Sequence, residues 1–129
     1  MTELVRERIQ AFGYEFKKAD ELLVETAVRK TENRVRSECG TPGVPEGMLD
    51  AAVDIAAGEF LFLKKVIAPK DIIGIDLDAA VKRIEVGDTA TVFAVGEGSL
   101  TEEQRFDCFV KHLLASGEKL YSQYRRIRW

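Results

Sequence analysis

The chain has 129 residues, a length that accommodates one domain with a single hydrophobic core and is short for two. Its 46% hydrophobic and 32% charged residues are typical of a globular protein. The net charge of −3 is uneven: residues 1–118 carry 22 acids and 15 bases, and residues 119–129 carry four bases and no acid. Because phosphate backbones are bound by clustered Lys and Arg, the acidic body argues against a nucleic-acid-binding domain, and the basic tail suits an acidic protein surface.

Cysteine and histidine are too scarce for a disulfide scaffold or a metal site. The two cysteines, Cys39 and Cys108, do not form a CxxC pattern, and His112 is the one histidine. The first ten residues interleave acids and bases without an apolar run, so no secretory signal is expected. We therefore expect a reducing compartment, no cofactor and no metal.

A first helix is predicted to begin near Thr2, which is a suitable N-terminal cap, and to end at Gly13. Residues 14–18 form a connector whose two aromatic side chains are expected to pin it to the core. The apolar residues that recur at helical spacing in this helix are Leu4, Val5, Ile9 and Phe12.

A second helix is predicted from the cap Asp20 to about Cys39, followed by the helix terminator Gly40. The short link to the next helix predicts that the two are antiparallel neighbours. The expected buried stripe of the second helix comprises Leu23, Val24, Ala27, Val28, Thr31 and Val35.

The segment 45–67 is predicted to form the central helix of the fold, because it is apolar on most of its circumference. Such a helix must be surrounded by other elements. Three acids divide it into short apolar runs, so it is not expected to span a membrane. Its one narrow polar strip is predicted to comprise Gly47, Asp50, Asp54, Gly58 and Lys65.

Beyond Pro69 the pattern changes to glycine and β-branched residues. Two strands, Val81–Val86 and Thr89–Val95, flank the dipeptide Gly87-Asp88, which is a usual two-residue hairpin loop. A β-hairpin over about 81–95 is therefore predicted. The alternative for Asp78–Ile84 is a helical turn.

A fourth helix is predicted to begin at Ser99, where Glu102 completes a capping box, and to end near Gly117. The residues that follow begin with helical spacing and end in alternation. The predicted core face of the fourth helix comprises Phe106, Phe109, Val110, Leu113 and Leu114.

The predicted fold class is therefore mainly α: a small bundle of about four helices around the central helix, with a hairpin excursion and an extended basic-aromatic tail. We expect one domain over 1–129. Its helical body covers 1–67 and 99–117, the hairpin region 70–98, and the tail 118–129.

Candidate catalytic groups are few. Cys108 and His112 lie one helical turn apart and resemble a nucleophile and base, but we interpret them as ordinary residues of an amphipathic helix. Asp76 and Asp78 lack the glycine and glutamate of a calcium loop. The acids of the central helix are expected on a strip that faces solvent or a subunit partner. The protein is therefore not expected to be an enzyme.

The terminal sequence YRRIRW is the strongest candidate for an interaction site, since Tyr, Arg and Trp are enriched in interface hot spots. Ile127 and Trp129 need apolar surroundings, either by folding back on their own core or by lying on a neighbouring subunit. The predicted interface residues of this region are Tyr121, Tyr124, Arg125, Arg126, Ile127, Arg128 and Trp129.

The order of these features is similar to that in one known family. PEGMLDAAVDIAAGEFLFLKK, then VKRIEVGDTATVFA, then GSLTEEQRFD and a closing YRRIRW resemble the head–tail connector (head-completion adaptor) proteins of long-tailed phages and prophages. The resemblance covers nearly the whole chain and rests on these motifs together.

The resemblance implies a non-enzymatic adaptor that assembles as a ring, commonly of twelve subunits, between the portal protein and a tail or stopper protein. Family members are often monomeric before they dock on the portal. DNA passes through the ring without sequence-specific binding. The implied location is the virion, reached from the host cytoplasm. The hairpin residues implied to touch a neighbour or the tail are Val86, Gly87, Asp88, Val92 and Phe93.

Two hypotheses from other classes remain. The first is a small helical regulatory or nucleic-acid-binding module that uses Arg125, Arg126 and Arg128 as a basic arm, against which the acidic body argues. The second is an enzyme that uses Cys108 and His112.

Overall fold

The computed structural model describes residues 1–72, 102–118, 120 and 121. Over this part the protein is mainly helical. Four α-helices are described, α1 (Thr2–Ala11), α2 (Asp20–Cys39), α3 (Leu49–Ile67) and α6 (Glu102–Leu114), together with the short 3-10 helices η1 (Glu46–Met48) and η2 (Pro69–Ile72). The predicted hairpin over 81–95 and most of the tail lie outside the described residues.

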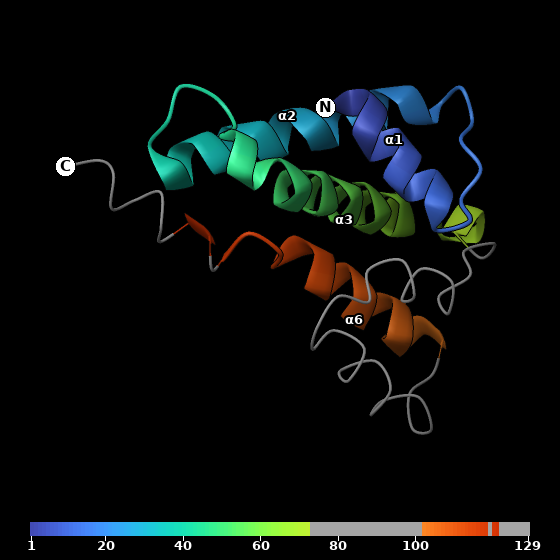
Figure 1. The fold of residues 1–129 in the computed structure, drawn as a ribbon. Coiled ribbons are helices and arrows are strands. Elements are labelled where there is room, and N and C mark those ends of the chain that lie inside the picture. The colour runs from blue at the N-terminus through green and yellow to red at the C-terminus, as the bar shows by residue number, and fades with distance from the viewer. Residues whose placement is uncertain (73–101, 119, 122–129) are drawn as a thin grey trace.

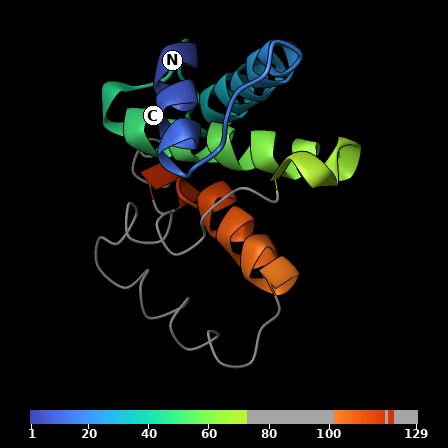
Figure 2. The same cartoon turned by 90° about the vertical axis from the view of Figure 1, so that its right-hand side faces the viewer.

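Helix α3 lies in the middle of the described fold, as its sequence predicts. Figures 1 and 2 show α1 and α2 on one side of α3 and α6 on the other. Contacts on both sides explain why α3 is apolar around most of its circumference. The buried residues of α3 are Ala51, Ala52, Val53, Ile55, Ala56, Ala57, Gly58, Phe60, Leu61 and Lys64.

Helices α2 and α3 run antiparallel, which confirms the prediction made from their short link. Asp20 at the start of α2 contacts Lys64 near the end of α3, and Lys30 pairs with Glu59 at 3.2 Å midway along. At the other end, Cys39 and Met48 belong to one apolar cluster. Gly40 ends α2 in the left-handed conformation, with φ of 66°, as predicted.

The core consists of two adjoining clusters. The larger one joins all four described α-helices and includes Ile9, Val24, Phe60 and Phe109. Its aromatic rings pack edge to face, with 5.0 Å between the centroids of Phe12 and Phe109. The smaller cluster, at the amino-terminal end of α3, comprises Val35, Cys39, Met48, Ala51, Ala52, Ile55 and Tyr121.

The connector between α1 and α2 is held by its aromatic residues, as predicted. Tyr14 is buried and Phe16 half-buried, and both rings contact Phe60 of α3, with centroid distances of 5.5 and 5.4 Å. Gly13 adopts the positive φ of 92° that the turn after α1 requires.

The predicted amino-terminal caps are wrong in detail. Thr2 is the first residue of α1 rather than its cap, and Met1 takes the cap position without a side-chain bond. Asp20 is likewise the first residue of α2, preceded by Ala19. Its carboxylate accepts a hydrogen bond from the backbone N–H of Lys17, outside the helix, and two more from the side chains of Tyr14 and Lys64.

Two other boundaries differ from the sequence prediction. The central helix does not begin at Pro45: residues Glu46–Met48 form a 3-10 turn and the α-helix begins at Leu49. The fourth helix is described from Glu102, and the predicted cap Ser99 lies outside the described residues. The predicted core face of α6 is confirmed, with Leu114 half-buried and the other four residues buried.

Gly58 is the largest departure from the predicted polar strip. It is buried, and a Cβ added there would lie 2.9 Å from Cβ of Leu113. The absence of a side chain therefore lets α6 approach α3 closely at this point. The strip contains a helix–helix contact within the chain, where the sequence alone suggested solvent or another subunit.

Candidate functional site: a groove between α3 and α6

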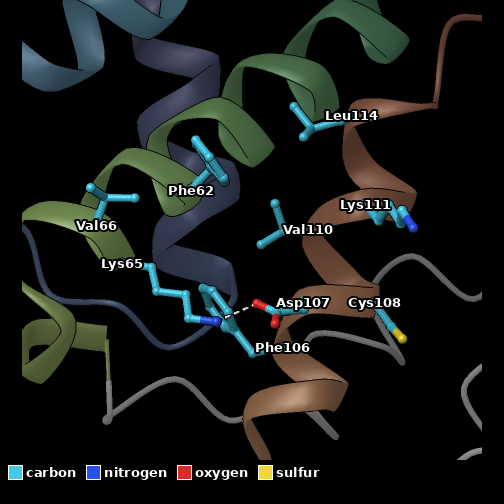
Figure 3. Close-up of a pocket in the computed structure, with 9 residues that line it drawn as sticks. All are labelled: Phe62, Lys65, Val66, Phe106, Asp107, Cys108, Val110, Lys111 and Leu114. Atoms are coloured by element: carbon cyan, nitrogen blue, oxygen red, sulfur yellow. Dashed lines mark hydrogen bonds and ion pairs between the residues drawn. The ribbon is translucent and has the colours of Figure 1, made fainter.

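A groove of about 550 Å³ lies between the carboxyl-terminal half of α3 and the part of α6 from Phe106 to Leu114. This volume lies within the range of about 300–1,000 Å³ that is usual for ligand pockets. Most of its lining side chains are apolar or aromatic. The lining residues, drawn in Figure 3, are Phe62, Lys65, Val66, Phe106, Asp107, Cys108, Val110, Lys111 and Leu114.

The groove exists because α3 and α6 meet closely at one point and separate beyond it. The close approach is at Gly58, which faces Leu113 and Leu114. Figures 1 and 2 both show α6 leaving α3 toward the end that carries Glu102. The groove begins at this contact, where Leu114 also lines it, and extends one to two turns along both helices.

One side of the groove is an exposed apolar ridge on α3. Phe62 is 50% exposed, Val66 69% and Ile67 63%. Phe62 and Val66 line the groove, and Figure 3 shows them opposite Val110 of α6. Single exposed apolar residues are common on protein surfaces, but neighbouring ones beside a groove are typical of an interaction site.

The polar rim of the groove is centred on Lys65. Its ammonium group pairs with Asp107 and lies 3.3 Å from a carboxylate oxygen of Glu103. It also lies 5.8 Å from the centroid of the Phe106 ring, in cation–π range. The hydrogen bond to Asp107 raises the pKa of Lys65, despite some desolvation. Lys65 therefore links the last turns of α3 to the first turns of α6 as a cation.

A second group of polar side chains is buried where the α1–α2 connector meets α3. The Asp20 carboxylate accepts hydrogen bonds from the ammonium of Lys64 and from the Tyr14 hydroxyl, the latter at 2.6 Å. All three side chains are almost fully buried. Burial alone would raise the pKa of Asp20, but the bonds from Lys64, Tyr14 and the Lys17 N–H outweigh it and lower that pKa.

The Tyr14–Asp20–Lys64 cluster joins the α1–α2 connector and α2 to α3, apart from the groove. Burial, together with the hydrogen bond to the Asp20 carboxylate, raises the pKa of Tyr14, so its hydroxyl remains a donor. The residues that line the groove do not include any of the three. A satisfied buried pair fixes how the connector and α2 sit on α3.

Cys108 and His112 are not buried together. Cys108 is exposed and lies on the rim of the groove, and His112 is half-buried one turn later in α6. In Figure 3 the Cys108 side chain points away from Phe62 and Val66. Within the described ranges, no group of three or more His, Cys, Asp or Glu side chains is arranged to hold a metal ion.

The acids of α3 are not simply solvated. Asp54 is half-buried and forms an ion pair with Arg8 of α1, and Glu59 forms one with Lys30 of α2. Burial raises the pKa of Asp54, and Arg8 partly offsets this. These two acids hold the other helices to α3, whereas Asp50 is exposed as expected.

Of the interface residues predicted from the sequence, only Tyr121 lies within the described residues. Its ring is 3% exposed and packs in the smaller core cluster, near Met48 and Ile55. Its hydroxyl is buried without a hydrogen-bond partner in the part that the structure describes. The other predicted residues, in the hairpin and in the tail from Tyr124, lie outside that part, so their role stays a prediction.

Compared with protein-family models, curated proteins and solved structures, the chain matches none. Function is therefore inferred from the residues and their geometry.

The groove was only partly foreseeable from the sequence. The exposed end of α3 from Phe62 to Val66 could be suspected, because the helix is apolar beyond what a four-helix body needs. The contribution of α6 to the groove could not be foreseen from the sequence, because the apolar residues of this helix all fit one core face. Similarly, neighbouring lysines 64 and 65 look equivalent in sequence, yet only Lys64 is buried.

None of the described helices is long and apolar enough to cross a membrane.

Proposed function

We propose that the protein is a structural adaptor of a phage or prophage virion. It assembles as a ring between the portal and the tail, completes the head and lets DNA pass. The observation that supports a binding role is the exposed apolar ridge of α3 beside the α3–α6 groove. The virion context rests on the resemblance of the ordered sequence motifs to head–tail connector proteins.

The charge distribution agrees with this proposal. A body with an excess of acids repels a DNA backbone, which suits a ring through which DNA slides. The tail, with four bases and no acid, is suited to an acidic surface on a portal or a second subunit. Within this proposal the tail from Tyr124 and the hairpin segment Val86–Phe93 are the attachment segments. A head-to-tail contact that closes generates the ring.

The proposal is tested by mixing the purified protein with portal particles and imaging the mixture by electron microscopy. Additional ring-shaped density on the portals is the expected result. A variant that lacks Tyr124–Trp129 is expected to leave the portals bare, whereas Leu22→Glu, an exposed residue of α2, serves as a control that still binds. Portals that remain bare with the full chain would refute the adaptor role, and docking of the truncated variant would refute the role of the tail.

A second candidate is a small regulatory or nucleic-acid-binding module, which the basic tail favours. It requires DNA binding that weakens steeply with salt and is lost when Arg125, Arg126 and Arg128 are changed. A gel-shift assay at low salt separates the two candidates, since the adaptor is expected to cause no retardation.

A further inference from the structure

We propose that the α3–α6 groove binds an amphipathic helix of a partner protein, and that this helix carries acidic side chains beside its apolar face. The inference rests on the binding role proposed above and names the chemistry of the partner at that site. It does not depend on the virion context, because the groove recognises the helix by its shape and charge.

The construction of the groove favours a helix over an extended peptide. All of its lining residues belong to α3 and α6, whose main-chain groups are already hydrogen-bonded within each helix. An extended peptide gains affinity from main-chain hydrogen bonds to a sheet edge, and these two helices offer none. A helix binds through side chains alone. The lining of α6 from Phe106 to Leu114 spans about two turns, or about 12 Å at 1.5 Å per residue, against which such a helix can pack.

The exposed ridge beside the groove favours an occupant larger than a small molecule. Phe106 and Val110 of the lining are buried, whereas Phe62 and Val66 are half exposed or more. Figure 3 shows Phe62 and Val66 on α3 opposite Val110 on α6. A small ligand between the helices would leave the outer side of the ridge, including Ile67, in water. A helix is about 10 Å across, so it covers the groove and the ridge together.

The charges around the groove favour acidic side chains on the bound helix. Lys65 is already paired with Asp107 and Glu103. Lys111 on the rim and Lys70 just beyond α3 are exposed, and neither makes an ion pair within the part of the chain that the structure describes. An incoming carboxylate therefore finds two lysines available, whereas an incoming cation competes with Lys65 for its acids. Such opposite charges at the edge of an interface direct the approach and register of a partner.

Two synthetic peptides test the proposal with the full chain. Both have about 15 residues, which is long enough for a marginally stable helix, and carry leucines at positions i, i+3, i+4 and i+7. One has glutamates beside the leucines, and the other has lysines at the same positions. We expect the acidic peptide to bind several-fold more tightly, as measured by fluorescence anisotropy of a label on the peptide. Equal affinity of the two peptides, or no binding of the acidic one up to the millimolar range, would overturn the proposal.

A matched pair of variants locates the contact on the surface. Val66→Glu places an acid on the ridge, and Leu22→Glu places one at an equally exposed site on α2, across α3 from the groove. Val66→Glu should weaken binding of the acidic peptide by roughly tenfold or more, and Leu22→Glu should leave it unchanged. Circular dichroism verifies that both variants remain folded. Equal binding by the two variants would show that the peptide does not lie on the ridge.

A reversal of charge on the rim tests the preference for acids. Lys111→Glu should abolish the difference in affinity between the acidic and basic peptides. Arg29→Glu makes the same change of charge at an exposed site on α2 and should leave the difference intact. A preference for the acidic peptide that persists in Lys111→Glu would contradict the charge match.

Other occupants of the groove give different results. Self-association of the protein at the concentrations of the binding assay, lost in Val66→Glu, would show by sedimentation that a second copy fills the groove. Displacement of the acidic peptide by laurate, a small amphipathic carboxylate, would assign the groove to a small ligand. Either result would overturn the proposal, and neither is expected. Ring-shaped density on portals in the absence of peptide binding would refute this inference and leave the adaptor role standing, whereas peptide binding with bare portals would do the reverse.

Discussion

Lys64 and Lys65 are adjacent in sequence, but their environments are opposite. Lys64 is 5% exposed and bonded to the fully buried carboxylate of Asp20, whereas Lys65 pairs with Asp107 and Glu103 at the surface. Removing one member of a buried ion pair leaves the other charge buried, with neither a partner nor water to stabilise it. An exposed pair is solvated and contributes little to stability.

We therefore expect Lys64→Met to lower the free energy of unfolding by about 3–5 kcal/mol, and Lys65→Met to change it by less than about 1 kcal/mol. Urea denaturation followed by circular dichroism measures both. Equal effects of the two substitutions would contradict the assignment of Lys64 to the buried pair.

Asp20 should also determine part of the response of the protein to acid. Its pKa in the folded state lies below the ordinary value of 3.8, so its stabilising contribution is complete above that pH and is lost as the pH falls through the folded-state pKa. The pKa of Asp54 is raised in the folded protein, so its protonation as the pH falls favours the folded state and partly opposes the effect of Asp20.

We expect the stability of the unchanged protein to fall as the pH drops below the ordinary carboxyl pKa of 3.8. That of Asp20→Asn should depend less on pH in this acid range, although it is lower overall at neutral pH. Urea titrations at several pH values measure the two slopes. An identical acid dependence in both proteins would show that Asp20 is not held ionised by Lys64 and Tyr14.

At the scale of elements, the packing of α6 on α3 depends on Gly58. An alanine there gains helix propensity of about 1 kcal/mol, but its Cβ would meet Cβ of Leu113, which is fixed to the α6 backbone. Such overpacking typically costs about 1–3 kcal/mol. The steric term should dominate, because neither helix can move without disturbing the core around Phe109.

Gly58→Ala is therefore expected to lower stability, by up to about 2 kcal/mol. Gly43→Ala provides the control, since a Cβ at Gly43 would meet nothing within 4 Å. Thermal denaturation of the two variants decides the point: a Gly58→Ala protein as stable as the Gly43→Ala protein would mean that α3 and α6 do not approach closely at Gly58.

At the scale of the whole molecule, the described helices share a continuous core that ends at Tyr121. We predict that residues from Tyr124 onward are not required for folding. A chain without Tyr124–Trp129 should keep its helical content, and its melting temperature should change by only a few degrees. Truncation before Tyr121 should destabilise it, by about 3–5 kcal/mol for loss of a buried aromatic residue.

Circular dichroism and calorimetry of the two truncated chains test this boundary. If removal of Tyr124–Trp129 alone unfolded the protein, the tail would be part of the core rather than an attachment to it. The binding experiments with the truncated chain would then need a full-length variant in their place.

The sequence by itself determined the elements that depend on local periodicity. The apolar stripes of α1, α2 and α6, the central position of α3 and the turns at Gly13 and Gly40 all follow from side-chain spacing and backbone conformation. The structure confirms them, except that Leu4 of the predicted α1 stripe is 42% exposed. These features are local, because the spacing of apolar residues over a few turns is enough to define the buried face of a helix.

Only the tertiary structure decided which polar and small residues of α3 are buried. Asp20 and Lys64 are 44 residues apart, Arg8 and Asp54 are 46 apart, and Gly58 meets α6 more than 50 residues later. Sequence spacing within one helix contains no information about such partners. The groove has the same origin, since it lies where two separately predictable helices diverge after their contact at Gly58.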